Sequence, residues 1–304
     1  MHKKEYVMKK YTVKEKRAIC QGLLFISPWL IGVIGFTLIP LLLAFGISLT
    51  DYNFLTEPKF VGLENYITMF TKDPLIWKSL GITLLYAVIS VPLQLAFGFL
   101  LANLLNQKLR GILVFRTLFY APCLVAVVSS TLLWKQMLET EFGIINYLLG
   151  LIGIDKVSWL GQTGTIIASV VFISLWQSGK MIIINLAGLQ AIPTVYYEAA
   201  DLDGCTRWRQ AFYITLPLMS PTIFMNLLIG LIGAFKTFTQ IKILTDGGPD
   251  NASLVYMLYI YKTAFTNYKL GYANAMSILL FAIVGILTVF VFRTSNKWVH
   301  YGSE

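Results

Sequence analysis

Charged residues are scarce in this chain, where only 13% of the 304 residues are Asp, Glu, Lys or Arg. Ordinary globular domains carry about 25% charged residues. Hydrophobic residues make up 57% of the sequence and are gathered into long runs instead of recurring at the spacing of a soluble core. Because a water-soluble protein of this length needs a far more polar surface, the composition excludes a soluble domain and predicts an integral membrane protein.

Residues that carry catalysis or bind metals are also few. The histidines, His2 and His300, lie near the chain ends, and the cysteines, Cys20, Cys123 and Cys205, lack the spacing of a metal site or a disulfide framework. The sequence contains no HExxH, no CxxC and no phosphate-binding GxxxxGK(S/T) loop. It therefore offers no catalytic residue, no metal site and no cofactor site of its own, and it favours transport over catalysis.

Long stretches without charge recur along the sequence, and six of them fit a membrane span. Each holds the roughly 20 apolar residues that a helix needs to cross the hydrocarbon core, and such runs exclude the alternating pattern of a membrane β-barrel. We predict an all-α integral membrane fold with one transmembrane domain over residues 1–304. Its six helices are expected at residues 20–49, 79–105, 113–134, 163–188, 212–235 and 273–292.

The basic residues set the orientation of these helices. With both termini on one side of the membrane, that side carries 14 of the 24 Lys and Arg residues, in short tails and loops where the positive-inside rule applies best. Both termini and the loop 192–217 are therefore predicted to face the cytoplasm. The net charge of +9 follows from this topology and does not indicate a nucleic-acid partner, since no basic face with interleaved aromatic residues forms a soluble domain.

Residues 198–217, EAADLDGCTRWRQAFYITLP, form a polar island between two apolar runs. Glu198 lies near the positive end of an expected helix, and Gly204 suits a helix stop in the left-handed region. Ala199 and Ala200 keep one face thin enough for close approach by a partner. With a second helix starting just beyond Gly204, the segment forms a short helix-turn-helix on the cytoplasmic surface. A surface loop with one helical turn and no partner explains the composition equally well.

The same segment resembles the coupling motif of binding-protein-dependent ATP-binding cassette (ABC) importers. That motif reads EAA, three residues, Gly, nine residues and then I-x-L-P. Its fixed positions are all filled here, by Glu198, Ala199, Ala200, Gly204, Ile214, Leu216 and Pro217. The resemblance covers nearly the whole chain. Three further stretches are similar to the carbohydrate-uptake, maltose-type branch: KLRG at 108–111, LTDGGP at 244–249 and FVGLENY at 60–66.

The resemblance implies a type I ABC importer permease fold, with six transmembrane helices and a cytoplasmic coupling helix. The chain would be a permease subunit, and no enzyme, of an ATP-driven importer of sugars, specifically oligosaccharides, in a bacterial or archaeal cytoplasmic membrane. Besides the lipid bilayer, its implied partners are a second permease subunit, two ATP-binding cassette subunits that hold ATP and Mg, and an extracytoplasmic solute-binding protein. The residues implied to couple to the ATPase are Glu198, Ala199, Ala200, Asp203, Gly204, Arg207, Ile214, Leu216 and Pro217.

Two other functions stay open at this point. One is a permease of the same transporter class for another solute, such as a glycerol phosphate, an amino acid or a peptide. The other is a stand-alone channel or ion-coupled carrier, which needs no coupling loop. Every Asp and Glu falls outside the predicted spans, and the absence of paired intramembrane carboxylates argues against proton or sodium coupling.

Candidate substrate contacts lie in the fourth and fifth spans and the stretch that follows. Within SLWQSGKM at 174–181, Trp176 is suited to stacking on a sugar ring and Gln177 both donates and accepts hydrogen bonds. Further polar candidates near the fifth span are Asn226, Thr237 and Gln240. The alternative for Trp176 is an interfacial or packing aromatic, and for Asn226 a hydrogen bond that only holds helices together.

Lys180 carries a charge inside the fourth predicted span. An intramembrane charge is a functional hypothesis by default, and Lys180 would pair with an anionic substrate such as an acidic sugar or a sugar phosphate. The alternative, which the sequence favours, is that Lys180 lies late in its helix and extends to the headgroups on the cytoplasmic side.

Overall fold

The computed structural model describes residues 12–107 and 109–300, and this part of the chain is built from helices with no strand. It also contains two isolated β-bridges, which join Thr50 to Phe60 and Asn53 to Thr56. The all-helical fold that the sequence predicts is confirmed. In chain order, with η for π-helical segments, the elements are α1 (Val13–Val33), η1 (Ile34–Leu38), α2 (Ile39–Ser48), α3 (Glu64–Thr71), α4 (Pro74–Leu105), α5 (Ile112–Leu124), α6 (Val127–Met137), α7 (Ile144–Leu151), α8 (Thr163–Trp176), α9 (Gly179–Ala191), α10 (Val195–Leu202), α11 (Arg207–Gln210), η2 (Ala211–Thr215), α12 (Leu216–Phe235), α13 (Thr239–Leu244), α14 (Tyr256–Tyr261), η3 (Lys262–Thr266) and α15 (Leu270–Ser295).

Four helical stretches in the described residues are long and apolar enough to cross a membrane by themselves. They are Ile19–Ser48, Pro74–Leu105, Arg207–Phe235 and Leu270–Ser295. Two more candidates are bent pairs: α5 with α6, which meet at 99°, and α8 with α9, which meet at 47°. Counting each bent pair as one span gives six, the number that the sequence predicts.

The expected continuous helices at 113–134 and 163–188 are both broken. The first stops shortly after Pro122, which has no amide hydrogen for the helix ladder and disfavours helical geometry in the residue before it. The second breaks just before Gly179, where a Cβ would lie 2.9 Å from the carbonyl oxygen of Phe119. Because Gly179 has no side chain, α9 approaches α5 closely at this point.

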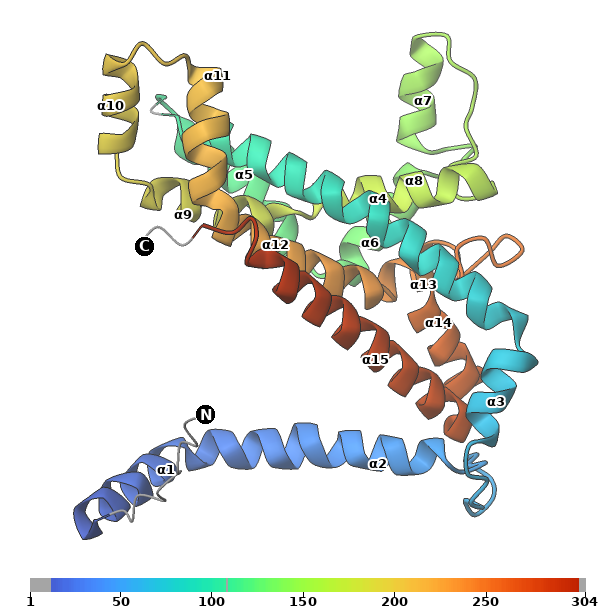
Figure 1. Cartoon of the computed structure of the whole chain (residues 1–304). Coiled ribbons are helices and arrows are strands. Elements are labelled where there is room, and N and C mark those ends of the chain that lie inside the picture. The colour runs from blue at the N-terminus through green and yellow to red at the C-terminus, as the bar shows by residue number, and fades with distance from the viewer. Residues whose placement is uncertain (1–11, 108, 301–304) are drawn as a thin grey trace.

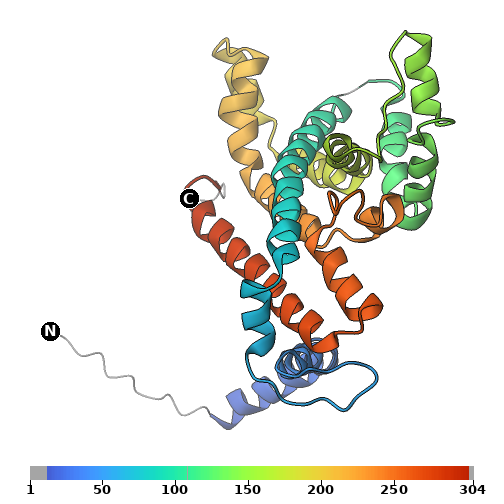
Figure 2. The ribbon, with the colours of Figure 1, turned by 90° about the vertical axis from the view of Figure 1, so that its right-hand side faces the viewer.

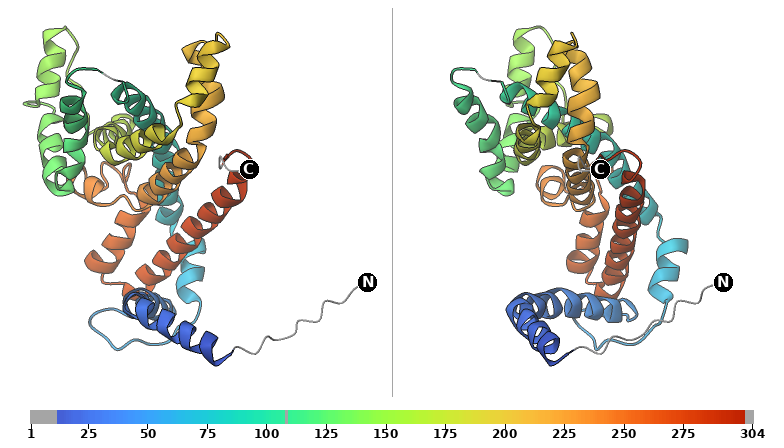
Figure 3. Two further views of the ribbon diagram at one scale, coloured as in Figure 1. Left: turned by 90° about the vertical axis from the view of Figure 1, so that its left-hand side faces the viewer. Right: turned by 60° about the vertical axis from the view of Figure 1, so that its left-hand side comes forward.

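The central helix of the bundle is α4, which packs against α8, α9 and α12. Figure 1 shows α10 and α11 at one end of the bundle, near the end of α15, while α3, α7 and the residues between α13 and α14 lie toward the other end. The α1–α2 helix lies apart from the others and meets them where α2 packs against α15 (Figures 2 and 3). Its exposed Phe25 and Phe36 suit a span that faces lipid or another subunit.

The loop after α2 is attached to the start of α15 through Gly271. The Gly271 amide donates to the carbonyl oxygen of Tyr52 at 2.9 Å, and a Cβ on Gly271 would overlap the carbonyl oxygen of Thr50. Asn65 secures the same loop, since its Nδ2 donates to the carbonyl oxygens of Ser48 and Thr50, both at 2.8 Å. This contact therefore holds the first span against the last.

Replacing Gly271 by alanine is expected to lower the thermal midpoint of the purified protein by several degrees. The new methyl group has no space, and overpacking of this kind costs about 1–3 kcal/mol. The matched control is Gly285→Ala on the same helix, where a Cβ meets nothing within 4 Å. Thermal unfolding in detergent measures both variants. Equal midpoints for the two would contradict the close packing at Gly271.

Candidate functional site

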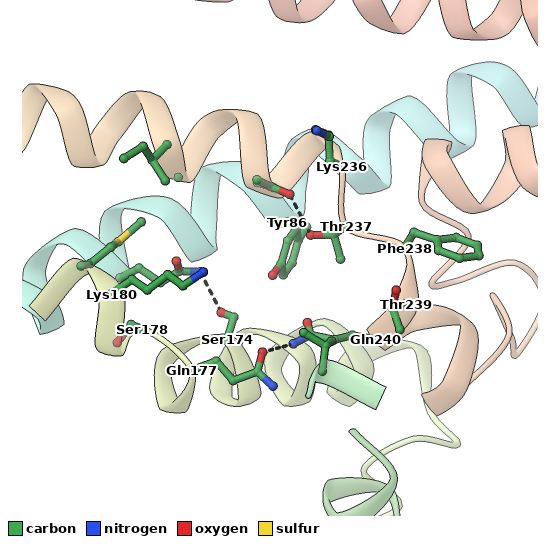
Figure 4. A pocket seen from close by; sticks show the side chains of 17 residues that line it. Tyr86, Ser174, Gln177, Ser178, Lys180, Lys236, Thr237, Phe238, Thr239 and Gln240 are labelled. Carbon is green, nitrogen blue, oxygen red and sulfur yellow. Dashed lines mark hydrogen bonds between the residues drawn. The ribbon is translucent and has the colours of Figure 1, made fainter. Parts of the chain in front are cut away.

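A cavity of about 350 Å³ is lined by residues of α4, α6, α8, α9, α12 and α13 and of the breaks between these helices (Figure 4). Tyr86 and Gln94 face it from α4, and Ser174 faces it from α8. Beyond these, its polar lining comes from Gln177, Ser178, Lys180, Lys236, Thr237, Thr239 and Gln240. Amides and hydroxyls thus outnumber charged groups around the cavity.

Three interruptions of helices meet at this cavity. The cavity lining includes the first residue of α6, the residues between α8 and α9, and the residues between α12 and α13. Backbone groups released from a helix are tolerated at membrane depth only where protein buries them or a water-filled cavity solvates them. Broken helices around a central cavity are the arrangement in which transporters build substrate sites.

A chain of side-chain hydrogen bonds through Gln177 joins these broken segments. Gln177 Nε2 donates to Ser130 Oγ on α6 at 2.7 Å, and Gln177 Oε1 accepts from Gln240 Nε2 on α13 at 2.6 Å. A second bond, from Gln94 Nε2 to Ser174 Oγ at 3.0 Å, links α4 to α8. Both amide ends of Gln177 are therefore occupied, and its position is fixed from two sides.

The structure brings four of the six residues proposed as substrate contacts to this cavity: Gln177, Lys180, Thr237 and Gln240. Trp176 lies outside it and stacks edge-on against Trp134, with the ring centroids 5.6 Å apart. Asn226 is fully buried between α12 and α9, where its Nδ2 donates to Asn185 Oδ1 at 2.9 Å. Neither Trp176 nor Asn226 therefore lines this cavity.

The expected position of Lys180 late in a helix is wrong. Lys180 is the second residue of α9, directly after the break, and eleven residues of that helix follow it. Its exposed side chain borders the cavity. The sequence pattern suggested a helix that continues from α8, so the position of the break could not be read from apolar runs alone.

Sequence reasoning missed the contributions of α4 and α6 to the site. Gln94 lies in a long charge-free run, and a single amide side chain in such a run could have indicated a residue that faces the site. Tyr86, Ser130 and Lys236 gave no comparable signal. Tyr86 and Ser130 resemble ordinary helix-packing residues, and Lys236 looks like the charged end of a span.

The coupling segment contains the predicted helix stop. Gly204 has φ +70°, in the left-handed region, and ends α10. The Cys205 amide donates to the Ala200 carbonyl oxygen at 2.8 Å, and the Gly204 amide donates to that of Asp201 at 3.1 Å. This pair of bonds is the Schellman arrangement that closes a helix on a glycine. The expected second helix follows as α11, with Thr206 as its N-cap residue.

Side-chain bonds hold α10 to the helix that follows. Gln210 Nε2 donates to Asp201 Oδ1 at 2.5 Å, and the hydroxyls of Tyr197 and Thr215 lie 2.9 Å apart. Two side-chain hydrogen bonds thus join the antiparallel segments that Figure 1 shows at α10 and α11.

The outer surface of this unit is exposed and partly apolar. Leu202 and Trp208 are 89% and 78% exposed. Ala199 and Ala200 were both predicted to leave a helix face open to close approach by a partner. Ala199 is exposed, as this requires, whereas Ala200 is buried against the rest of the chain. The remaining residues proposed for coupling divide into an exposed set, Glu198, Asp203, Gly204 and Arg207, and a partly buried set, Ile214, Leu216 and Pro217, which carries the helix into the fifth span.

An ion-pair cluster fixes the loop between α13 and α14, which begins with the TDGGP of the LTDGGP stretch. Lys242 Nζ lies 2.8 Å from Asp246 Oδ1, and Lys262 Nζ lies 3.3 Å from Asp246 Oδ2. Partial burial raises the pKa of Asp246, but the hydrogen bond from Lys242 and the charge of Lys262 together hold that pKa below its usual range.

Residues 94–301 match the family described as binding-protein-dependent transport system inner membrane component. The chain belongs to this family. It is 41% identical over 287 residues to the probable ABC transporter permease protein YesP of Bacillus subtilis (strain 168), covering 93% of each chain. It is 35% identical over 273 residues to the trehalose/maltose transport system permease protein MalF of Thermococcus litoralis, covering 88% of this chain and 91% of that one.

The fold of this family member also matches a solved structure. A chain in the crystal structure of a bacterial alginate ABC transporter, in complex with an alginate pentasaccharide-bound periplasmic protein, superposes with a TM-score of 0.79 at 24% identity. The match covers 94% of this chain and 96% of that chain. The type I permease fold and the resemblance drawn from the coupling motif are thereby confirmed. The chain is a membrane-spanning transport component and not an enzyme.

Proposed function

We propose that this chain is the permease subunit of an ATP-driven, binding-protein-dependent importer of oligosaccharides. The cavity at the three helix breaks carries the proposal, because it offers amide and hydroxyl groups that match the hydroxyl groups of a sugar. Permeases named for trehalose/maltose, for starch degradation products and for multiple sugars are 31–35% identical to this chain, which supports the same class of cargo.

The helix-turn-helix of α10 and α11 is the proposed contact to the ATPase. Closure of a cytoplasmic ATPase dimer, which holds ATP and Mg, would move this exposed unit as a rigid body and so switch the access of the cavity. The chain would act with a second permease subunit and an extracytoplasmic solute-binding protein, in a bacterial or archaeal cytoplasmic membrane. Both termini and α10 would then lie on the cytoplasmic side, as the distribution of basic residues favours.

Uptake by the complete transporter tests this function. The chain is assembled in liposomes with the second permease, the ATPase subunits and the binding protein of its own transport system. We expect ATP-dependent uptake of at least one oligosaccharide from a panel of labelled neutral and acidic trisaccharides, and no uptake when ATP is omitted. Uptake restricted to glycerol phosphate, amino acids or peptides would reassign the cargo, and transport that continues without ATP would contradict the importer class.

A further inference from the structure

The charges around the cavity are all of one sign. Lys180 borders it from α9, and Lys236 borders it from the end of α12 (Figure 4). No Asp or Glu lines the cavity, and the three ion pairs of the described residues all involve other lysines. Within that part of the chain, neither ammonium group has an ion pair or a hydrogen-bond partner, and both side chains are exposed.

Two unpaired ammonium groups at one cavity favour an anionic occupant. Lys180 lies within the bent α8–α9 pair, where a charge is costly and is normally retained for a ligand, a pathway or a partner charge, and Lys236 follows the last residue of α12. The start of α9 adds to the effect, because Ser178, its N-cap residue, and Lys180 both line the cavity. The positive end of a discontinuous membrane helix is where transporters place the anionic group of a substrate.

The uncharged polar residues of the cavity indicate what the rest of the bound molecule contains. Gln94, Ser174, Gln177 and Gln240 present amides and a hydroxyl, which suit the many hydroxyl groups of a saccharide. We infer that the cavity takes an acidic saccharide, whose anionic group lies between Lys180 and Lys236 while its hydroxyl groups face the amides. This inference rests on the proposed function and narrows its substrate class.

The inference is tested by measuring how tightly saccharides bind to the permease–ATPase complex itself. The solute-binding protein is left out, because it would select among the saccharides before they reach the cavity. The permease–ATPase complex is placed in nanodiscs, and its affinities for trigalacturonate and for the trimethyl ester of trigalacturonate are compared. The two probes have the same sugar skeleton and differ in charge. We expect the acid to bind about a hundredfold more tightly, about tenfold for each ammonium group, in line with the strength of charged over neutral hydrogen bonds, and its advantage to shrink at high salt.

The lysine variants assign the effect to the cavity. Lys180→Gln and Lys236→Gln should each weaken binding of the acid by about tenfold and leave binding of the ester unchanged, and the double variant should remove the preference for the acid. The matched control is Lys59→Gln, in an exposed loop that does not line the cavity, which should leave both affinities at the wild-type level. A hexose 6-phosphate and the parent hexose form a second pair of probes. A charge preference confined to that pair supports an anionic saccharide and identifies phosphate as its acidic group.

Three outcomes would overturn the inference. The first is the same affinity of the wild-type complex for the charged and the neutral probe in both pairs, and the second is an equal loss of both affinities in Lys180→Gln. The third is failure of the complex to assemble in the lysine variants, which would instead assign Lys180 and Lys236 to carboxylates of the second permease. If the transporter takes up neutral oligosaccharides but no acidic ones, the inference of an acidic substrate is wrong and the proposed function still holds. If it takes up no saccharide at all, the proposed function is wrong.

Discussion

Replacing Gly204 by proline is expected to reduce ATP-driven uptake by about a hundredfold, while the protein still inserts into the membrane. Proline is locked at φ near −65°, whereas Gly204 stands at +70° and donates its amide hydrogen to Asp201. Losing that geometry and that bond destabilises the native turn between α10 and α11 by about 3 kcal/mol, which lowers its population about a hundredfold. A loosened turn no longer transmits movement of the ATPase to the spans. Uptake and substrate-stimulated ATP hydrolysis are measured side by side in liposomes.

Asparagine at the same position is the matched control. Asparagine tolerates the left-handed region and keeps the amide hydrogen, and a Cβ at Gly204 meets nothing within 4 Å. Gly204→Asn should therefore retain uptake within a few-fold of wild type. Glu198→Lys should act in the direction of the proline variant, because it puts a positive charge on the exposed first turn of α10, near the positive end of that helix. Normal substrate-stimulated ATPase activity in Gly204→Pro would argue against the coupling role.

The second large effect is expected from Gln177→Leu, which should lower uptake by about 10- to 100-fold at limiting substrate. Leucine has a similar volume but removes the bonds to Ser130 and Gln240, so that the broken ends of three spans lose their common link. Each lost bond is worth about 1 kcal/mol, and the Gln240 amide left without a partner adds to this. We expect the change mainly in the apparent KM, since Gln177 lines the cavity.

Gln190→Leu provides the control for this substitution. Gln190 lies on α9, in the same bent pair, but its side chain is exposed and does not line the cavity. Uptake by this variant should match wild type, and both variants should assemble with the ATPase to the same extent. If uptake by Gln177→Leu at limiting substrate stays within twofold of wild type, the cavity is not the substrate pathway.

The coupling segment was predicted well because its structure depends on local chemistry. The helix stop at Gly204 and the restart of the helix just beyond it follow from backbone preferences that neighbouring residues set, and the structure shows both. Ala200 was assigned to the exposed face and is buried, since the side of a short helix that faces its neighbour depends on how the two pack. The match to a family motif identified the segment, but only packing shows which of its side chains are accessible.

The cavity was predicted less well because it is assembled from distant parts of the chain. Gln177 and Gln240 are 63 positions apart and share a 2.6 Å hydrogen bond, and no pattern in either neighbourhood shows that they meet. Trp176 was selected for its aromatic ring, but at a helix break one residue decides whether a side chain faces the cavity or the neighbouring Trp134. The same break moved Lys180 from an expected helix end to the border of the cavity.

The sequence alone determined that this is an all-helical membrane protein with six candidate spans, and it located the coupling motif, because burial in lipid and backbone hydrogen bonding act on each segment separately. Only the tertiary structure decided where the spans break, which polar groups converge and that two lysines without a carboxylate border one cavity. Those features depend on contacts between segments far apart in the chain, and hydrophobicity, which marks each span, carries no information on which polar side chains meet.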